Sequence, residues 1–158
     1  VPGGFYDADS VFHALPTSTN QTYTKKYFDS SPVRADSKAN WKVIRYADVL
    51  LMYAEALNEN GKPQQAIPFL NQVRTRAGLE GYPNTMSQTE TRDAIVLERR
   101  LELSFEGVRW FDLVRTGKAY EVMKDKGMAP YMTVFPIPLS QVQIINDPTI
   151  FPQNPGYD

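Results

Sequence analysis

The 158-residue sequence contains no cysteine and only one histidine, His13. Without cysteine the chain forms no disulfides, has no thiolate nucleophile and offers no cysteine ligands for zinc. A single histidine leaves no histidine cluster for a metal and little basis for a Ser-His-Asp triad. The sequence therefore predicts a protein without a metal site or a cofactor, and it argues against an enzyme.

An excess of charge of either sign is also missing. Seventeen Lys and Arg residues face eighteen Asp and Glu residues, so the formal net charge is −1. Such a chain lacks the positive field of proteins that bind nucleic acid, and we expect no nucleic-acid partner. No apolar run approaches the roughly 18 residues of a membrane-spanning helix. A hydrophobic fraction of 42% is ordinary for a globular domain.

Apolar periodicity predicts a mainly α fold. Helices are expected over about 44–60 and 63–77, joined at Gly61, with the small residues Ala54 and Ala66 where the two helices cross. This hairpin fits the tetratricopeptide template. A capping box, Ser87 with Glu90, opens a third helix that should reach Glu106. Its expected apolar stripe consists of Leu97, Leu101, Phe105 and Val108, and the apolar face of the first helix includes Val43 and Ile44. Shorter helices are expected over 108–114, 119–126 and 140–145.

Both ends of the chain are predicted to be long coil segments. Residues 1–40 are rich in Ser, Thr, Asp, Asn and Pro, and only one short strand is expected there, over 23–28. Prolines interrupt the chain after Met128. We therefore expect an irregular segment over 1–40 and a helical domain over 41–158.

Charged residues recur on the expected helices. Glu98, Glu102 and Glu106 lie four residues apart, with arginines interleaved among them. Carboxylates with this spacing point in the same direction, so they cannot flank a glycosidic bond as a hydrolase requires. We expect a structural network of ion pairs, in which Arg99 or Arg109 meets Glu55 and Arg45 lies within reach of Asp48.

Five segments, in order along the chain, resemble the C-terminal part of a SusD/RagB-family protein. They are RYADVLLMYAEA at 45–56, LNQVRTRAG at 70–78, ERRLELSFEGVRWFDL at 98–113, FPIP at 135–138 and QNPGY at 153–157. The resemblance covers residues 41–157. The motif residues with an expected structural role are Arg45, Asp48, Ala54, Glu55, Ala66, Arg99, Glu102, Glu106, Arg109 and Trp110.

The resemblance implies a function. Family members are surface lipoproteins of the outer membrane in Bacteroidetes, much longer than this chain, that capture glycans or peptides without hydrolysing them. They deliver the ligand to a TonB-dependent, SusC-like β-barrel transporter. The chain is thus expected to be the C-terminal third of such a protein, with the lipid anchor upstream of Val1 as its only attachment to the membrane. An oligosaccharide is the expected ligand.

Sugar-binding platforms use the flat faces of exposed aromatic rings, and ligand loops concentrate in irregular segments. Tyr6, Tyr23, Tyr27 and Trp41 are therefore the candidate glycan-binding residues. The aromatic side chains within helices, Tyr46, Tyr53, Trp110 and Phe111, are expected to be packed instead. Two alternative functions remain open at this point. One is a tetratricopeptide-like adaptor that binds a peptide in a helical groove, and the other is a glycan hydrolase or its accessory protein.

Overall fold

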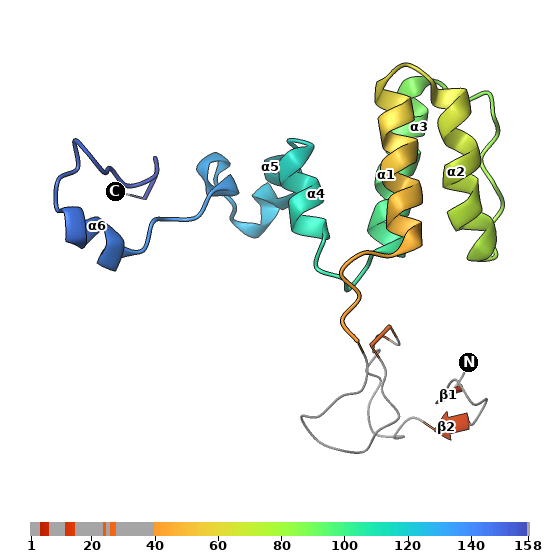
Figure 1. The fold of residues 1–158 in the computed structure, drawn as a ribbon, viewed down its shortest axis with the longest axis horizontal. Helices are drawn as coiled ribbons and strands as arrows, with labels where there is room; N and C mark the ends of the chain where they lie inside the picture. The colour runs from red at the N-terminus through yellow and green to blue at the C-terminus, as the bar shows by residue number, and fades with distance from the viewer. Residues whose placement is uncertain (1–3, 7–11, 15–23, 25, 28–39, 158) are drawn as a thin grey trace. The chain divides into compact units, whose positions relative to one another are not determined.

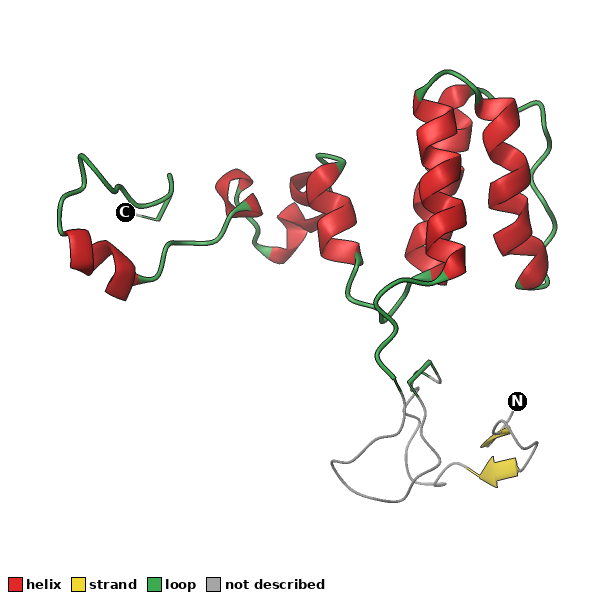
Figure 2. Ribbon diagram, in the orientation of Figure 1, coloured by secondary structure: helices red, strands yellow, loops and turns green. Residues whose placement is uncertain are grey.

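The computed structural model describes residues 4–6, 12–14, 24, 26–27 and 40–157. Helices dominate these residues (Figure 2), which confirms the prediction of a mainly α fold. The chain divides into two compact units, residues 1–105 and residues 106–158. The predicted boundary after residue 40 stays a prediction. No helix in the described part of the chain is long and apolar enough to cross a membrane.

Two short strands lie near the start of the first unit. β1 (Gly4–Tyr6) pairs antiparallel with β2 (Phe12–Ala14). The strand predicted over 23–28 is wrong for the described residues of that segment, because Lys26 and Tyr27 form a turn. The Lys26 amide donates a 3.3 Å hydrogen bond to Thr24 Oγ1, a local bond that competes with strand pairing.

The predicted hairpin is present as α1 (Tyr46–Glu59) and α2 (Pro63–Arg76), which lie side by side in Figure 1. Between them Gly61 adopts φ +73°, a left-handed conformation that glycine reaches without strain. Pro63 occupies the first turn of α2, where its missing N–H costs no helical bond. The turn chemistry therefore ends one helix and starts the next within three residues.

The core of the first unit lies between α1, α2 and a third helix, α3 (Gln88–Glu102). Ala54 and Ala66 are both fully buried, as are Leu51 and Leu70. Small side chains at these positions let the α1 and α2 backbones approach closely, and the larger leucines fill the space on either side.

Replacing Ala54 with leucine should lower the free energy of unfolding by about 1–3 kcal/mol, because the extra carbons have no space between α1 and α2. Ala56→Leu is the matched control, since Ala56 lies on the same helix and is exposed. Urea unfolding followed by circular dichroism measures both variants. Equal midpoints for the two would show that Ala54 does not lie at a close helix crossing.

The capping box predicted for α3 is confirmed. The Glu90 amide donates to the Ser87 hydroxyl, and the Ser87 amide donates to Glu90 Oε2 at 2.7 Å. The Ser87 hydroxyl and amide lower the pKa of the Glu90 carboxyl group by donating hydrogen bonds to it. A charged carboxylate at this end also complements the helix dipole.

α3 ends at Glu102, four residues before the predicted end. The Lys26 ammonium donates to the backbone oxygen of Glu102, the last residue of the helix, and to that of Ser104 in the turn that follows. Phe105 then adopts φ +66°, which is incompatible with continuing a right-handed helix. The segment 103–107 is consequently a turn.

The predicted stripe on α3 is wrong, because Leu97, Leu101 and Phe105 are exposed. The buried face of α3 contains Thr91, Ala94, Ile95, Glu98 and Arg99 instead. These residues keep the helical spacing of three and four, but two of them are charged and paired across the interface. A pattern of apolar residues alone therefore selects the wrong face.

Five further expectations of burial are also wrong. Tyr46, Tyr53 and Phe111 are 72%, 51% and 71% exposed, and Val43 and Ile44 precede α1 and are exposed. Tyr53 makes an edge contact with Phe69 across the hairpin, at 4.7 Å between ring centroids. Trp110 is half-buried.

The second unit contains short helices. They are α4 (Arg109–Arg115), α5 (Ala119–Met123), η1 (Lys124–Lys126), η2 (Pro130–Thr133) and α6 (Leu139–Ile145). Three of these were predicted from the sequence, as 108–114, 119–126 and 140–145. The buried residues Leu113 and Ala119 lie in α4 and α5, which pack together.

Side chains hold the extended segments of the second unit together. Gln153 accepts a bond from the Ile137 amide and donates one to the Ile137 carbonyl, at 2.6 and 2.8 Å. Asn154 donates to the Phe135 carbonyl and the Tyr157 hydroxyl donates to that of Val134. The final motif, at 153–157, is thereby fixed against residues 134–137 without forming a sheet.

Candidate functional site

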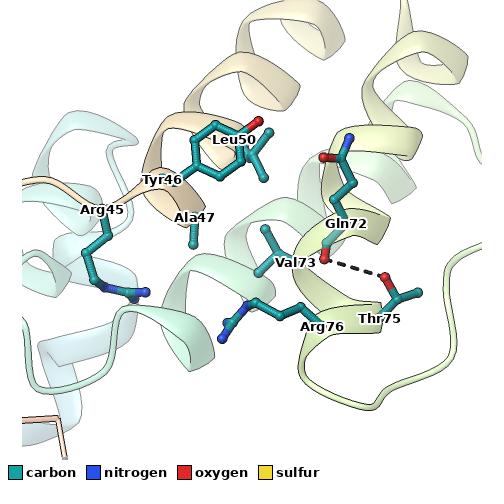
Figure 3. Close-up of a pocket in the computed structure, with 8 residues that line it drawn as sticks. All are labelled: Arg45, Tyr46, Ala47, Leu50, Gln72, Val73, Thr75 and Arg76. Carbon is teal, nitrogen blue, oxygen red and sulfur yellow. Dashed lines mark hydrogen bonds between the residues drawn. The ribbon is translucent and has the colours of Figure 1, made fainter.

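A pocket of about 560 Å³ opens between the start of α1 and the end of α2 (Figure 3). Its floor is apolar and its wall is polar. The residues that line it are Arg45, Tyr46, Ala47, Leu50, Gln72, Val73, Thr75 and Arg76. This volume lies within the range of sites that bind small molecules.

Glu102 joins the two arginines of the pocket. Arg45 Nη1 donates to Glu102 Oε1 at 2.9 Å, and Arg76 Nη2 donates to Oε2 at 2.6 Å. Figure 3 shows the two guanidinium groups extending toward each other from α2 and from the residue before α1. Arg45 also donates to the Glu102 carbonyl at 3.0 Å. One carboxylate therefore fixes two cations at one side of the pocket.

Two further ion pairs cross the buried interfaces of the three helices. Arg74 donates to Glu98 at 2.9 Å and Arg99 donates to Asp48 at 2.8 Å. Arg99 thus reaches α1, the helix that also carries Glu55, its predicted partner. An arginine therefore holds each of these two carboxyl groups in place.

An exposed pair connects α1 and α3 near the other end of the helices. Arg92 donates to both carboxylate oxygens of Glu59 at 2.7 Å. The Arg92 side chain lowers the pKa of the Glu59 carboxyl group, chiefly through this bidentate hydrogen bond. Among the described residues, no group of three or more His, Cys, Asp or Glu side chains could hold a metal ion.

The predicted glycan-binding residues have different outcomes. The rings of Tyr27 and Trp41 stack at 5.0 Å between centroids and 5° between planes, and Trp41 is 64% exposed. Tyr6 ends β1. Tyr23 lies outside the described residues. The structure therefore brings together two of the four, Tyr27 and Trp41, as a flat aromatic pair.

The SusD family model matches residues 13–149. The chain belongs to the SusD family. It is 32% identical to a SusD-like protein of Formosa agariphila over 89% of its own length and 31% of that protein's length. A SusD homolog of Bacteroides thetaiotaomicron has 32% identity, a TM-score of 0.70 and coverage of 84% of this chain and 30% of that one.

A third similar protein is a laminarin-binding SusD-like protein, 40% identical, with a TM-score of 0.60. The match covers 82% of this chain and 26% of that one. The chain thus spans less than a third of the length of each of these relatives.

Within the SusD-family motif at 70–78, the structure shows what the polar residues do. Asn71 bonds both the amide and the carbonyl of Tyr82, at 2.7 and 2.9 Å. Arg74 donates to the Glu80 carbonyl and lies 4.1 Å from the Tyr82 ring centroid. Through Asn71 and Arg74, the motif holds the segment that follows α2. Arg74 also joins α2 to α3 through its ion pair with Glu98.

Sequence reasoning missed Lys26, Arg74 and Arg76 as partners of the glutamates on α3. Arg74 and Arg76 are two residues apart on α2, and each contacts a different glutamate of α3, Glu98 and Glu102. Arginines near the end of one helix and glutamates near the end of the next helix along the chain are a signal that could have indicated this pairing.

The motif residues Glu106, Arg109 and Trp110 lie in the second unit. Trp110 lines a smaller, mostly apolar pocket of about 390 Å³ together with Met123, Lys126, Gly127, Met128, Met132 and Phe135. Arg109 begins α4. Glu106 lies in the turn before it. Of the two pockets, the one between α1 and α2 has the charged and polar wall that a polar ligand requires.

Proposed function

We propose that this chain is part of a protein that captures a glycan at the outer surface of the cell and delivers it to a TonB-dependent β-barrel transporter. The observation that carries the proposal is the 40% identity to a laminarin-binding SusD-like protein over 82% of the chain. Attachment to the outer membrane through a lipid outside this sequence is part of the same proposal.

The glycan platform is proposed at Tyr27 and Trp41, with Tyr6 and Tyr23 as further contributors. The two rings are parallel and stacked, so Tyr27 supports the Trp41 ring, whose exposed surface can meet the C–H face of a sugar ring. The exposed Trp41 ring is the part of this pair that a ligand reaches from solvent. The tetratricopeptide-like hairpin is accounted for by membership of the family, so it gives no separate support to an adaptor function.

The proposed role is non-catalytic. A glycosidase needs one carboxyl group that can donate a proton and another that acts on the opposite side of the bond. Glu98 and Glu102 instead accept charged hydrogen bonds from arginines of α2. The two carboxyl groups also lie four residues apart on one helix, so they project from the same side of α3 and cannot stand on opposite sides of a bond.

Trp41→Ala should weaken binding of laminarihexaose at least about tenfold, because one stacked ring contributes on the order of 1–2 kcal/mol to binding. Isothermal titration calorimetry measures the affinity. Tyr120→Ala is the matched control, since Tyr120 is a partly exposed aromatic residue of α5. We expect it to bind like the unchanged protein.

When the protein is incubated with laminarin, the concentration of reducing ends should not increase. Hydrolysis that disappears in Glu102→Gln would contradict the non-catalytic role. Equal binding by Trp41→Ala and Tyr120→Ala would place the glycan elsewhere. Absence of binding to every member of a broad glycan panel would contradict glycan capture itself.

A further inference from the structure

Cationic side chains gather beside the pocket between α1 and α2, at the end of α3. Arg45 and Arg76 bind the Glu102 carboxylate, and Lys26 binds the Glu102 backbone oxygen. The neighbouring Asp48 carboxylate accepts a hydrogen bond from Arg99. The two arginines that line the pocket therefore share the Glu102 carboxylate.

Arg76 is the cation that a ligand can reach. Its side chain is 60% exposed, against 22% for Arg45, and it lines the pocket from the last turn of α2. Its bond to Glu102 uses one terminal nitrogen, Nη2. A guanidinium group carries five N–H donors in a fixed plane, so the same group can bind a second anion in a bidentate geometry.

The rest of the pocket suits a sugar ring better than a free inorganic anion. Tyr46 lies at the edge of the pocket and is 72% exposed, and Ala47, Leu50 and Val73 form an apolar floor. Gln72 and Thr75 lie on the α2 side (Figure 3). An aromatic face, an apolar floor and a few polar groups match the mixed surface of a pyranose.

We propose that this pocket binds an acidic sugar unit of a glycan, with the Arg76 guanidinium group on its anionic substituent and the Tyr46 ring against its apolar face. The anionic substituent is a uronate carboxylate or a sulfate ester, which a guanidinium group recognises in the same way. This inference rests on the proposed glycan capture and specifies a charged class of ligand for a second site in the same unit.

Paired oligosaccharides of equal length test the inference. Tetragalacturonate is compared with its fully methyl-esterified form, and a sulfated galactan tetrasaccharide with its desulfated form. Amide chemical shifts of the ¹⁵N-labelled chain report binding at Gln72, Thr75 and Arg76 even when the affinity is low. We expect at least one acidic probe to bind at least about tenfold more tightly than its neutral counterpart, and the pair that differs identifies the substituent.

Arg76→Gln should remove this preference for the acidic probe, because it deletes the charge at the pocket and keeps an amide in its place. Arg92→Gln is the matched control. Arg92 also pairs with a glutamate, Glu59, but it lies near the start of α3, away from the pocket. Its effect should be less than about twofold. Tyr46→Ala should weaken the acidic and the neutral member of a pair by a similar factor, since the ring carries no charge. Circular dichroism confirms that each variant is folded.

Equal affinity for both members of each pair would overturn the inference, as would equal effects of Arg76→Gln and Arg92→Gln. Laminarihexaose separates this failure from that of the proposed function. If laminarihexaose binds and the acidic probes show no preference, only the acidic site is wrong. If no oligosaccharide binds, glycan capture and the acidic site both fail.

Discussion

Replacing Arg74 with methionine should lower the free energy of unfolding of the three-helix unit by about 3–5 kcal/mol. The Glu98 side chain is only 3% exposed, and Arg74 is the ion-pair partner that the structure gives it. Without Arg74 a charged carboxylate stays buried with no cation beside it, which is far more costly than the loss of an exposed pair. Urea unfolding followed by circular dichroism at 222 nm measures the difference.

Two variants separate the buried charge from other effects of Arg74. Arg92→Met removes an arginine whose pair with Glu59 is exposed, so it should cost much less. The double variant Arg74→Met with Glu98→Leu leaves no unpaired charge and should recover most of the stability. A double variant as unstable as Arg74→Met would mean that the bond to Glu80 and the contact with Tyr82 cause the loss instead.

Gly156→Ala should release the C-terminal motif from residues 134–137. A Cβ atom at position 156 would lie inside the van der Waals surface of the Tyr131 ring. The backbone there has φ +90°, which alanine also disfavours. Overpacking costs about 1–3 kcal/mol and a left-handed conformation about 1–2 kcal/mol. Hydrogen exchange of the Ile137 amide, which donates to Gln153, should accelerate at least about tenfold.

Gly127→Ala is the control for backbone strain alone. Gly127 has φ +87°, and nothing lies within 4 Å of the position of an added Cβ. Its substitution should leave exchange at Ile137 nearly unchanged. Adding Tyr131→Ala to Gly156→Ala should restore part of the protection, because the clash disappears. Fast exchange in the double variant, equal to that of Gly156→Ala, would argue against the ring contact.

Helix positions could be predicted from the sequence because their signals are local. Gly61 and Pro63 end and begin helices through their own backbone preferences, and Ser87 with Glu90 satisfies neighbouring amides. The end of α3 could not be predicted in the same way. Lys26 caps it from a position 76 residues away from Glu102 along the chain, and no pattern within the helix indicates that contact.

Burial on α3 could not be predicted from apolar spacing. Leu97 and Leu101 are exposed, whereas the charged Glu98 and Arg99 are buried. Their burial is possible only because Arg74 and Asp48 lie opposite them on other helices. Periodicity within one segment carries no information about such partners, so a charged buried face looks like a solvent face.

The candidate site was only partly accessible to sequence reasoning. Tyr27 and Trp41 could be named as candidates because they stand in an irregular segment, where ligand loops concentrate, but their stacking was not predicted. The pocket was not found, because Arg45 and Arg76 lie 31 positions apart and come together only through Glu102. Its Tyr46 was expected to pack within the fold, yet the ring stands at the edge of the pocket.

The amide side chains that hold the extended segments have a consequence for how the sequence can vary. Gln153 bonds the main chain of Ile137, and Asn71 bonds the main chain of Tyr82, so these bonds do not depend on which side chain the partner carries. Substitutions at the partner positions can accumulate without loosening the connection, whereas Gln153 and Asn71 cannot change freely. Each extended segment is therefore held by one amide side chain from another part of the sequence, and the side chains within the segment itself can vary.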